Sequence, residues 1–335
     1  MKIDAPISNL AAQAGPAAAR QEALGYDGVR VAELQHEPFL PLALAAEHTK
    51  RVELVSGVAV AFARSPMVLA QIAHDLNAFS GGRLVLGIGS QVKPHVERRF
   101  DMPWGKPAPQ MRDYLTAMRA IFACWYEGAR LEHDGDYYTF NLMPDTFRPR
   151  NTECGPPRIN LSATGPLMTQ VAAELADGMI MHPFSTERYI REVTLPAIEK
   201  GRARRSSPSE HFELDYAPMI ATGRTEEELA QSIEHIRGRI AFYGCTVAYR
   251  PVLELHGWGE LQDELIPLNR AHRTKEMAGL ISDEVLRTIA IVGEPREVVE
   301  EMRRRLGDTI GRTGFSVPGM DDGETAELLE ALKRA

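Results

Sequence analysis

Short apolar runs alternate with amphipathic segments along almost the whole chain of 335 residues. The run at 84–88 (LVLGI) is apolar at every position, as expected of a parallel strand that is buried on both faces. Behind Ser65-Pro66, apolar residues recur at helical spacing, and a serine followed by a proline is a favourable helix start. The pattern therefore predicts alternating strands and helices. Eight strands are expected, at residues 3–7, 28–33, 52–62, 84–88, 158–162, 178–182, 212–220 and 314–317.

Helices are expected between these strands, and their ends carry recognisable signals. Gly25 stands just past one apolar segment, where a glycine commonly ends a helix. Thr225 is followed three residues later by Glu228, which is the spacing of a capping box. The expected helices cover residues 11–24, 39–48, 66–79, 110–126, 166–176, a segment from Thr225 onward, and 293–306.

Eight strand–helix units without a break in composition predict an α/β fold, a (β/α)8 TIM barrel with loop insertions. The alternative is a doubly wound open sheet, which needs a phosphate-binding glycine turn after the first strand. Ser8-Asn9-Leu10 stands there instead, so the sequence favours the barrel. We expect one domain over residues 1–335. Its insertions are expected near 91–109, near 130–142 as a hairpin that turns at Asp134-Gly135, and near 250–290 as an irregular, partly helical segment.

Charge and composition exclude several classes of function. The net charge is −8, which gives no electrostatic footprint for nucleic acid. No run of 18 apolar residues predicts a membrane span, and the N-terminus lacks the apolar region of a signal peptide, so we expect a cytoplasmic protein. Cys124, Cys154 and Cys245 are widely spaced without a CxxC pair, and no HxH or HExxH pattern occurs. Neither a disulfide framework nor a metal site is therefore predicted.

Two small-residue segments follow predicted strands, at the end of a barrel where active sites form. Gly87-Ile88-Gly89-Ser90 offers bare backbone that could lie against a flat ring or an anion, although Val92 stands where a full GxGxxG needs its third glycine. Ser162-Ala163-Thr164-Gly165 precedes a helix, whose N-terminal amides favour an anion. A strand end that needs close backbone approach explains the first segment equally, and an ordinary helix cap explains the second.

Acid–base chemistry has three candidates near the same end of the barrel. Glu33 and His36 follow the second strand, and His182 ends the sixth. For Glu33 and His36 the alternative is a surface loop. Aromatic side chains that could form substrate walls are Phe62, Trp104 and Trp258, each of which could equally be a packing residue.

Several segments together resemble the luciferase-like monooxygenase superfamily, and the match runs over most of the chain. They include EALGYDGV at 22–29, VELVSGV at 52–58, SGGR at 80–83, LGIG at 86–89, AAELADG at 172–178 and VGEPREV at 292–298. The spacing of SGGR, LGIG and ADG is specific, and the pattern is more similar to the F420-dependent branch than to the long-chain aldehyde luciferases.

The resemblance implies a (β/α)8 barrel that binds FMN or the deazaflavin F420, commonly as a dimer. It implies that Ser56, Gly57, Val58 and Ala59 back the cofactor ring, often through a non-prolyl cis peptide. Gly87, Gly89 and Ser90 would approach the cofactor chain, and Ser162, Ala163, Thr164 and Gly165 would hold its phosphate. Some F420-dependent relatives have an acidic residue followed directly by histidine after the second strand. Here Leu34 follows Glu33, and the nearest histidine is His36.

We therefore expect an oxidoreductase that transfers hydride between coenzyme F420 and a small organic substrate. The alternatives are an FMN-dependent monooxygenase on the same barrel, a non-catalytic flavin-binding protein and, last, a metal-dependent barrel hydrolase. The anionic tail that distinguishes F420 from FMN needs positive charge near the ring. The candidates, which could also be plain surface charge, are Arg64, Lys93, Arg98 and Arg99.

Overall fold

Eight parallel strands close into a barrel in the computed structural model, which describes residues 1–205, 211–317 and 319–334. Around the barrel the strands are β1 (Lys2–Pro6), β2 (Gly28–Val31), β3 (Glu53–Ser56), β5 (Leu84–Gly89), β8 (Arg158–Ala163), β9 (Gly178–Met181), β10 (Glu213–Tyr216) and β13 (Arg312–Gly314). β13 pairs with β1 in the register Lys2↔Arg312, and β3 pairs with β5 in the register Leu54↔Leu84, which closes the ring. The expected (β/α)8 barrel is confirmed.

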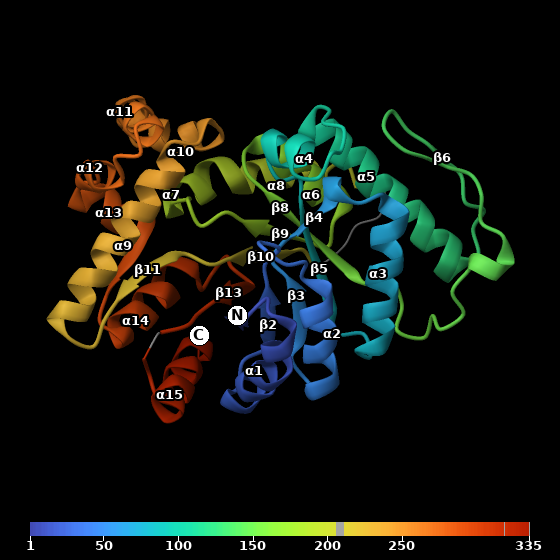
Figure 1. Ribbon diagram of the computed structural model, residues 1–335, viewed down its shortest axis with the longest axis horizontal. Helices are drawn as coiled ribbons and strands as arrows, with labels where there is room; N and C mark the ends of the chain where they lie inside the picture. The colour runs from blue at the N-terminus through green and yellow to red at the C-terminus, as the bar shows by residue number, and fades with distance from the viewer. Residues whose placement is uncertain (206–210, 318, 335) are drawn as a thin grey trace.

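Helices surround this ring, as Figure 1 shows. Ser65 Oγ accepts a 3.2 Å hydrogen bond from Val68 N and caps α3, and Gly25 ends α1 with a φ of 97°, so both sequence signals hold. The helices next to the barrel strands are α1 (Ala11–Leu24), α2 (Phe39–His48), α3 (Pro66–Phe79), α4 (Lys93–Arg98), α5 (Pro107–Phe122), α6 (Pro166–Leu175), α7 (Glu187–Tyr189), α8 (Leu195–Arg202), α14 (Pro295–Leu306) and α15 (Asp322–Lys333).

The strand expected at 212–220 is wrong as one continuous element. β10 stops at Tyr216, and Ala217-Pro218 leads into β11 (Met219–Thr222), which leaves the barrel. Proline has no N–H to donate to a sheet ladder, so the strand breaks there. β11 pairs in parallel with β12 (Ala290–Gly293), a strand that the sequence analysis missed. The last barrel strand covers 312–314 rather than 314–317, because Thr313 is paired with Ile3 and Arg312 with Lys2.

The segment expected to be irregular and partly helical is largely helical. It forms α10 (Arg250–Leu255), α11 (Gly259–Arg270), α12 (Thr274–Gly279) and α13 (Asp283–Ile289). With α9 (Glu226–Gly244), β11 and β12, these helices enclose a second hydrophobic cluster that includes Ile236, Leu253 and Leu265. Figure 1 shows this group, coloured from gold to orange-red, on the left side of the barrel.

The hairpin expected around Asp134-Gly135 is confirmed as β6 (His133–Asp134) paired antiparallel with β7 (Thr139–Phe140). Asp113 on α5 organises the turn, because its carboxylate accepts hydrogen bonds from Tyr137 N at 2.6 Å and Tyr138 N at 3.0 Å. The hairpin is thereby attached to the barrel's outer helices.

Candidate active site

The strand expected at 52–62 is interrupted at the barrel mouth. β3 ends at Ser56, the peptide between Gly57 and Val58 is cis, and β4 (Ala59–Val60) then pairs with β5. The cis peptide that the resemblance implied within 56–59 is confirmed. Ser56 is buried, and its hydroxyl donates a 2.8 Å hydrogen bond to the carbonyl of Gly87.

Three of the expected cofactor residues meet at this mouth, one from β5, one from β8 and one from the link between β3 and β4. A Cβ added to Gly89 would lie 3.1 Å from Cγ2 of Val58 and 3.4 Å from Cβ of Ser162. Gly87 lies two residues earlier on β5, and a Cβ there would lie 1.9 Å from the Ser56 carbonyl oxygen. Ser90 lies at the rim, where its hydroxyl donates to the carbonyl of Gln91 at 3.1 Å. Bare backbone thus lines one side of the mouth.

The N-terminus of α6 lies next to this backbone. Gly165 precedes the helix with φ 77° and ψ 159°, a conformation open essentially only to glycine, and Pro166 occupies the first helical position. The first intrahelical bond runs from Thr169 N to the Gly165 carbonyl at 3.2 Å. The N–H groups of Leu167 and Met168 precede that bond and point along the helix axis, which is the arrangement that favours an anion.

Glu33 lies at the mouth, but its carboxylate is fully engaged. Oε2 accepts 2.7 Å and 2.8 Å hydrogen bonds from Val60 N and Arg64 Nη1, and Oε1 accepts a 3.0 Å bond from Arg64 Nη2. The carboxylate is nearly buried in this bidentate pair, which fixes the chain after β4. Arg64 is therefore held by Glu33, rather than free to meet a cofactor tail. The sequence expectation had treated the two residues separately.

The other three expected tail residues lie on or beside α4, and two of them have partners within the chain. Lys93 forms an ion pair with Glu97 at 3.6 Å, and Arg99 donates to the Leu34 carbonyl at 2.5 Å. Arg98 is exposed. His36 is exposed on the loop after β2, a few residues beyond Glu33.

His182 follows β9 and is packed between aromatic rings. Its ring stacks on Tyr249 with centroids 4.4 Å apart and meets the edge of Tyr243 at 4.6 Å. Burial, with a further contribution from the nearby charge of Arg239, lowers the pKa of His182 to about 4. Phe184 N donates to Nδ1 at 3.0 Å, so the neutral ring carries its proton on Nε2. His182, Thr164 and Gly165 line the same small cavity.

The three expected substrate walls are not brought together. Phe62 is 2% exposed and meets Trp104 edge to face at 5.8 Å, so Trp104 is the ring of this pair with access to solvent. Trp258 stacks on His256 at 4.6 Å and packs against the second hydrophobic cluster, apart from the other two.

A charged network fills the barrel interior, and sequence reasoning missed it. Arg30 Nη2 donates to Asp4 at 2.7 Å and to Asp215 at 2.6 Å, and the side chain of Arg30 covers Gly57. Burial raises the pKa of Asp215 to about 6 despite the contact with Arg30. The sequence did carry a signal for this network: charged residues alternate with apolar ones in the short strand segments IDA, VRV and ELDY.

Deeper in the barrel, Arg312 on β13 forms ion pairs with carboxylates on β1, β3 and β10. It pairs with Asp4 at 2.5 Å, with Glu213 at 2.9 Å and with Glu53. Although burial alone would raise it, the pKa of Glu53 is lowered to about 2 by Arg312, with help from Lys2 and Arg158. Each buried carboxylate in this network therefore has a cationic partner.

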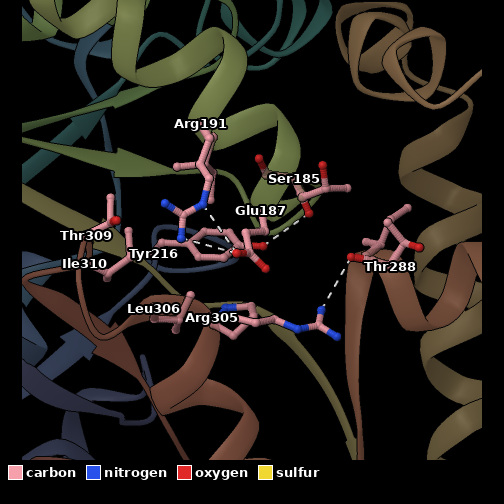
Figure 2. Close-up of a pocket in the computed structure, with 13 residues that line it drawn as sticks. Ser185, Glu187, Arg191, Tyr216, Thr288, Arg305, Leu306, Thr309 and Ile310 are labelled. Carbon is pink, nitrogen blue, oxygen red and sulfur yellow. Dashed lines mark hydrogen bonds and ion pairs between the residues drawn. The ribbon is translucent and has the colours of Figure 1, made fainter. Parts of the chain in front are cut away.

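An open cleft of about 750 Å³ lies over the carboxyl ends of β1, β2, β10 and β13. Its floor includes Asp4 and Arg30, and its wall is α9 with β11. A second cavity, shown in Figure 2, lies around Tyr216 and Arg305 and holds only about 20 Å³, the room of about one water molecule. In Figure 2, Tyr216 and Arg305 bond to Ser185 and Thr288 of the surrounding chain. That cavity is a packing gap, whereas the cleft is large enough to admit a small molecule.

Within residues 1–205, 211–317 and 319–334, no three His, Cys, Asp or Glu side chains gather as they would around a metal ion. Over the same residues, no helix is both long and apolar enough to cross a membrane.

The chain forms a (β/α)8 barrel with an open cleft at the carboxyl ends of its strands, the end where active sites of such barrels lie. The family description "Luciferase-like monooxygenase" matches residues 7–312, and the chain belongs to this family of enzymes. An uncharacterized protein of Mycobacterium tuberculosis is 44% identical, over 93% of this chain and 92% of its own length.

Two further relatives share this fold or sequence. A 5,10-methylenetetrahydromethanopterin reductase of Archaeoglobus fulgidus is 30% identical, over 78% of this chain and 75% of its own length. The solved structure of the coenzyme F420-dependent tetrahydromethanopterin reductase of Methanopyrus kandleri superposes with a TM-score of 0.77 at 19% identity. That superposition covers 98% of this chain and 96% of the other, and it supports the barrel fold.

Proposed function

We propose that the protein is an F420-dependent oxidoreductase that transfers hydride between the deazaflavin and a small organic substrate. The observation that carries this proposal is the meeting of Val58, Gly89 and Ser162 at the mouth, beside the open N-terminus of α6. A flat ring needs such side-chain-free backbone, and a phosphate suits the helix end. The 30% identical methylenetetrahydromethanopterin reductase supports the choice of branch.

In this proposal, bound F420 supplies the hydride donor or acceptor, and the chain supplies binding and orientation. The Gly57–Val58 backbone would lie behind the ring, and Arg30 packs against Gly57. Leu167 N and Met168 N would donate to the phosphate, and Thr164 precedes them in the chain.

Two of the three acid–base candidates have side-chain contacts that suggest a role. Glu33 is tied to Arg64 and Val60, so it positions the chain after β4. His182 is neutral because its pKa lies near 4, and it keeps an Nε2–H to donate. We therefore propose that His182 donates a hydrogen bond to a ligand at the mouth and does not deliver a proton as an imidazolium.

The test is equilibrium titration of the purified protein with F420 and with FMN, followed by absorbance and fluorescence. We expect saturable binding of F420, with a Kd at least tenfold lower than that of FMN. Tighter binding of FMN would favour the monooxygenase alternative. If neither cofactor binds, both the F420-dependent and the FMN-dependent assignment are overturned.

A further inference from the structure

We infer that the cleft between the barrel mouth and α9 binds an organic anion as substrate, through Arg239. The assignment of this anion as the substrate rests on the proposed function, whereas the anion site itself is argued from the cleft alone. It assigns a chemical class, a carboxylate or a phosphate ester, to a molecule that the proposed function leaves open.

Arg239 is the unpaired cation of this cleft. It lies on α9, is only partly exposed, and forms no hydrogen bond or ion pair with the residues that the structure describes. The other two arginines of the lining are engaged: Arg30 binds Asp4 and Asp215, and Arg224 pairs with Glu324 at 3.3 Å. A guanidinium that has lost part of its water without gaining an anion is unfavourable, and a carboxylate or phosphate satisfies it in a bidentate manner.

The acidic groups of the lining do not neutralise Arg239. Asp4 is buried beneath Arg30 and also bound by Arg312. Glu228 accepts a 2.8 Å hydrogen bond from Arg224 N, at the opposite end of α9 from Arg239. The nearby charge of Arg239 also contributes, after burial, to lowering the pKa of His182, so the guanidinium lies close to that ring.

The position of Arg239 suits a substrate better than the cofactor's phosphate. The cleft lies over β1, β2, β10 and β13, whereas the α6 N-terminus follows β8. Arg30 lies on the cleft floor and also covers Gly57, so its side chain lies between the cleft and the backbone proposed to hold the ring. An anion held at Arg239 would therefore approach the ring from the side away from the phosphate.

Arg239 also lines a neighbouring hollow of about 630 Å³ with Phe242, Tyr243 and Lys275. Phe242 is 59% exposed, and Tyr243 contacts His182. This hollow offers aromatic surface to the carbon skeleton of the anion, next to the cation that would hold its charged group.

The test compares Arg239→Gln with the matched variant Arg224→Gln, which removes the same charge from the same cleft at a paired residue. The probes are phenyl phosphate and benzoate, with benzamide as a neutral control, titrated by calorimetry at constant ionic strength. We expect at least one anion to bind the parent protein, with a Kd at least tenfold higher in Arg239→Gln and changed less than twofold in Arg224→Gln. Benzamide should not bind, and the two anions show which charged group is preferred.

Binding of F420 distinguishes the source of the anion. Its Kd should change less than twofold in Arg239→Gln, and a tenfold loss would assign Arg239 to the cofactor and overturn the inference. Absence of saturable anion binding to the parent, or equal losses in both arginine variants, would also overturn it. If Arg239→Gln does not fold, Arg239→Lys is used, and unchanged anion affinity there would count against a bidentate contact. If F420 does not bind at all, the proposed function is overturned, but the anion titrations can still be interpreted.

Discussion

Gly87 shows at the scale of a single residue why a glycine is required in this barrel. The Ser56 carbonyl oxygen, which belongs to the neighbouring strand, occupies the space of a Cβ. We expect Gly87→Ala to lower the free energy of unfolding by about 3 kcal/mol, because a backbone atom cannot move aside as a flexible side chain would. Gly238→Ala, in the middle of α9 with nothing within 4 Å, is the control and should raise it by about 0.5–1 kcal/mol. Urea unfolding of both variants measures the difference, and equal stabilities would contradict it.

His182 gives a second prediction at this scale, because its pKa is depressed. The folded protein holds a neutral ring down to a pH of about 4, whereas the unfolded chain protonates it near its usual pKa of 6.5. The stability that this difference contributes is therefore present above pH 6.5 and is lost as the pH falls through about 4. We expect the parent to lose about 1–3 kcal/mol more than His182→Asn between pH 7 and pH 4. Parallel denaturant curves at the two pH values test this, and parallel losses in both proteins would refute it.

The N-terminus of α6 gives the prediction at the scale of an element. The φ and ψ of Gly165 disfavour any residue with a side chain. A substitution there should therefore lower the free energy of unfolding by about 1–3 kcal/mol, whatever the charge of the new residue. Gly165→Asp and Gly165→Asn share this backbone cost and differ only in charge. If a phosphate binds here, Gly165→Asp should bind cofactor at least tenfold more weakly than Gly165→Asn, with similar melting temperatures. Equal cofactor affinities in the two variants would remove the phosphate from this helix end.

At the scale of the whole molecule, the charged network joins strands that are far apart in sequence. Arg30 and Arg312 pair with Asp4, Glu53, Glu213 and Asp215 inside the ring, and the half-exposed Lys2 and Arg158 pair with Glu53 at its edge. Four cations meet four carboxylates, so ionisation of every member leaves the network neutral. The strands that supply these residues include the first and the last of the barrel, and the network therefore helps to close it.

Asp215 allows this network to be tested by pH. Its pKa is raised from 3.8 to about 6, so the folded protein binds a proton more tightly than the unfolded chain. The stabilising contribution of the protonated carboxyl is present below pH 3.8 and is lost as the pH rises through about 6. The stability of the parent minus that of Asp215→Asn should therefore fall by about 1–3 kcal/mol from pH 4 to pH 8. A difference that stays constant or rises over this range would show that Asp215 is ionised throughout.

The alternation of apolar runs and amphipathic segments was enough to predict the barrel. Six of its eight strands were located within a few residues, and those at 52–62 and 212–220 were predicted too long, because a buried parallel strand shows as a short apolar run wherever its partners lie. The hairpin at Asp134-Gly135 and the caps at Ser65 and Gly25 were also predictable, since they depend on neighbouring residues alone.

Features that depend on residues far apart in the chain were decided only by the tertiary structure. The pairing of β11 with β12 joins positions about seventy residues apart, and no local pattern specified it. Glu33 was a candidate acid until the fold brought Arg64 and Val60 N to both of its oxygens. The sequence did not single out Arg239, because only the fold shows that it has no ion-pair partner among the described residues. Sequence determines which groups can ionise or pack locally, whereas the closed ring determines which of them meet and which remain unpaired.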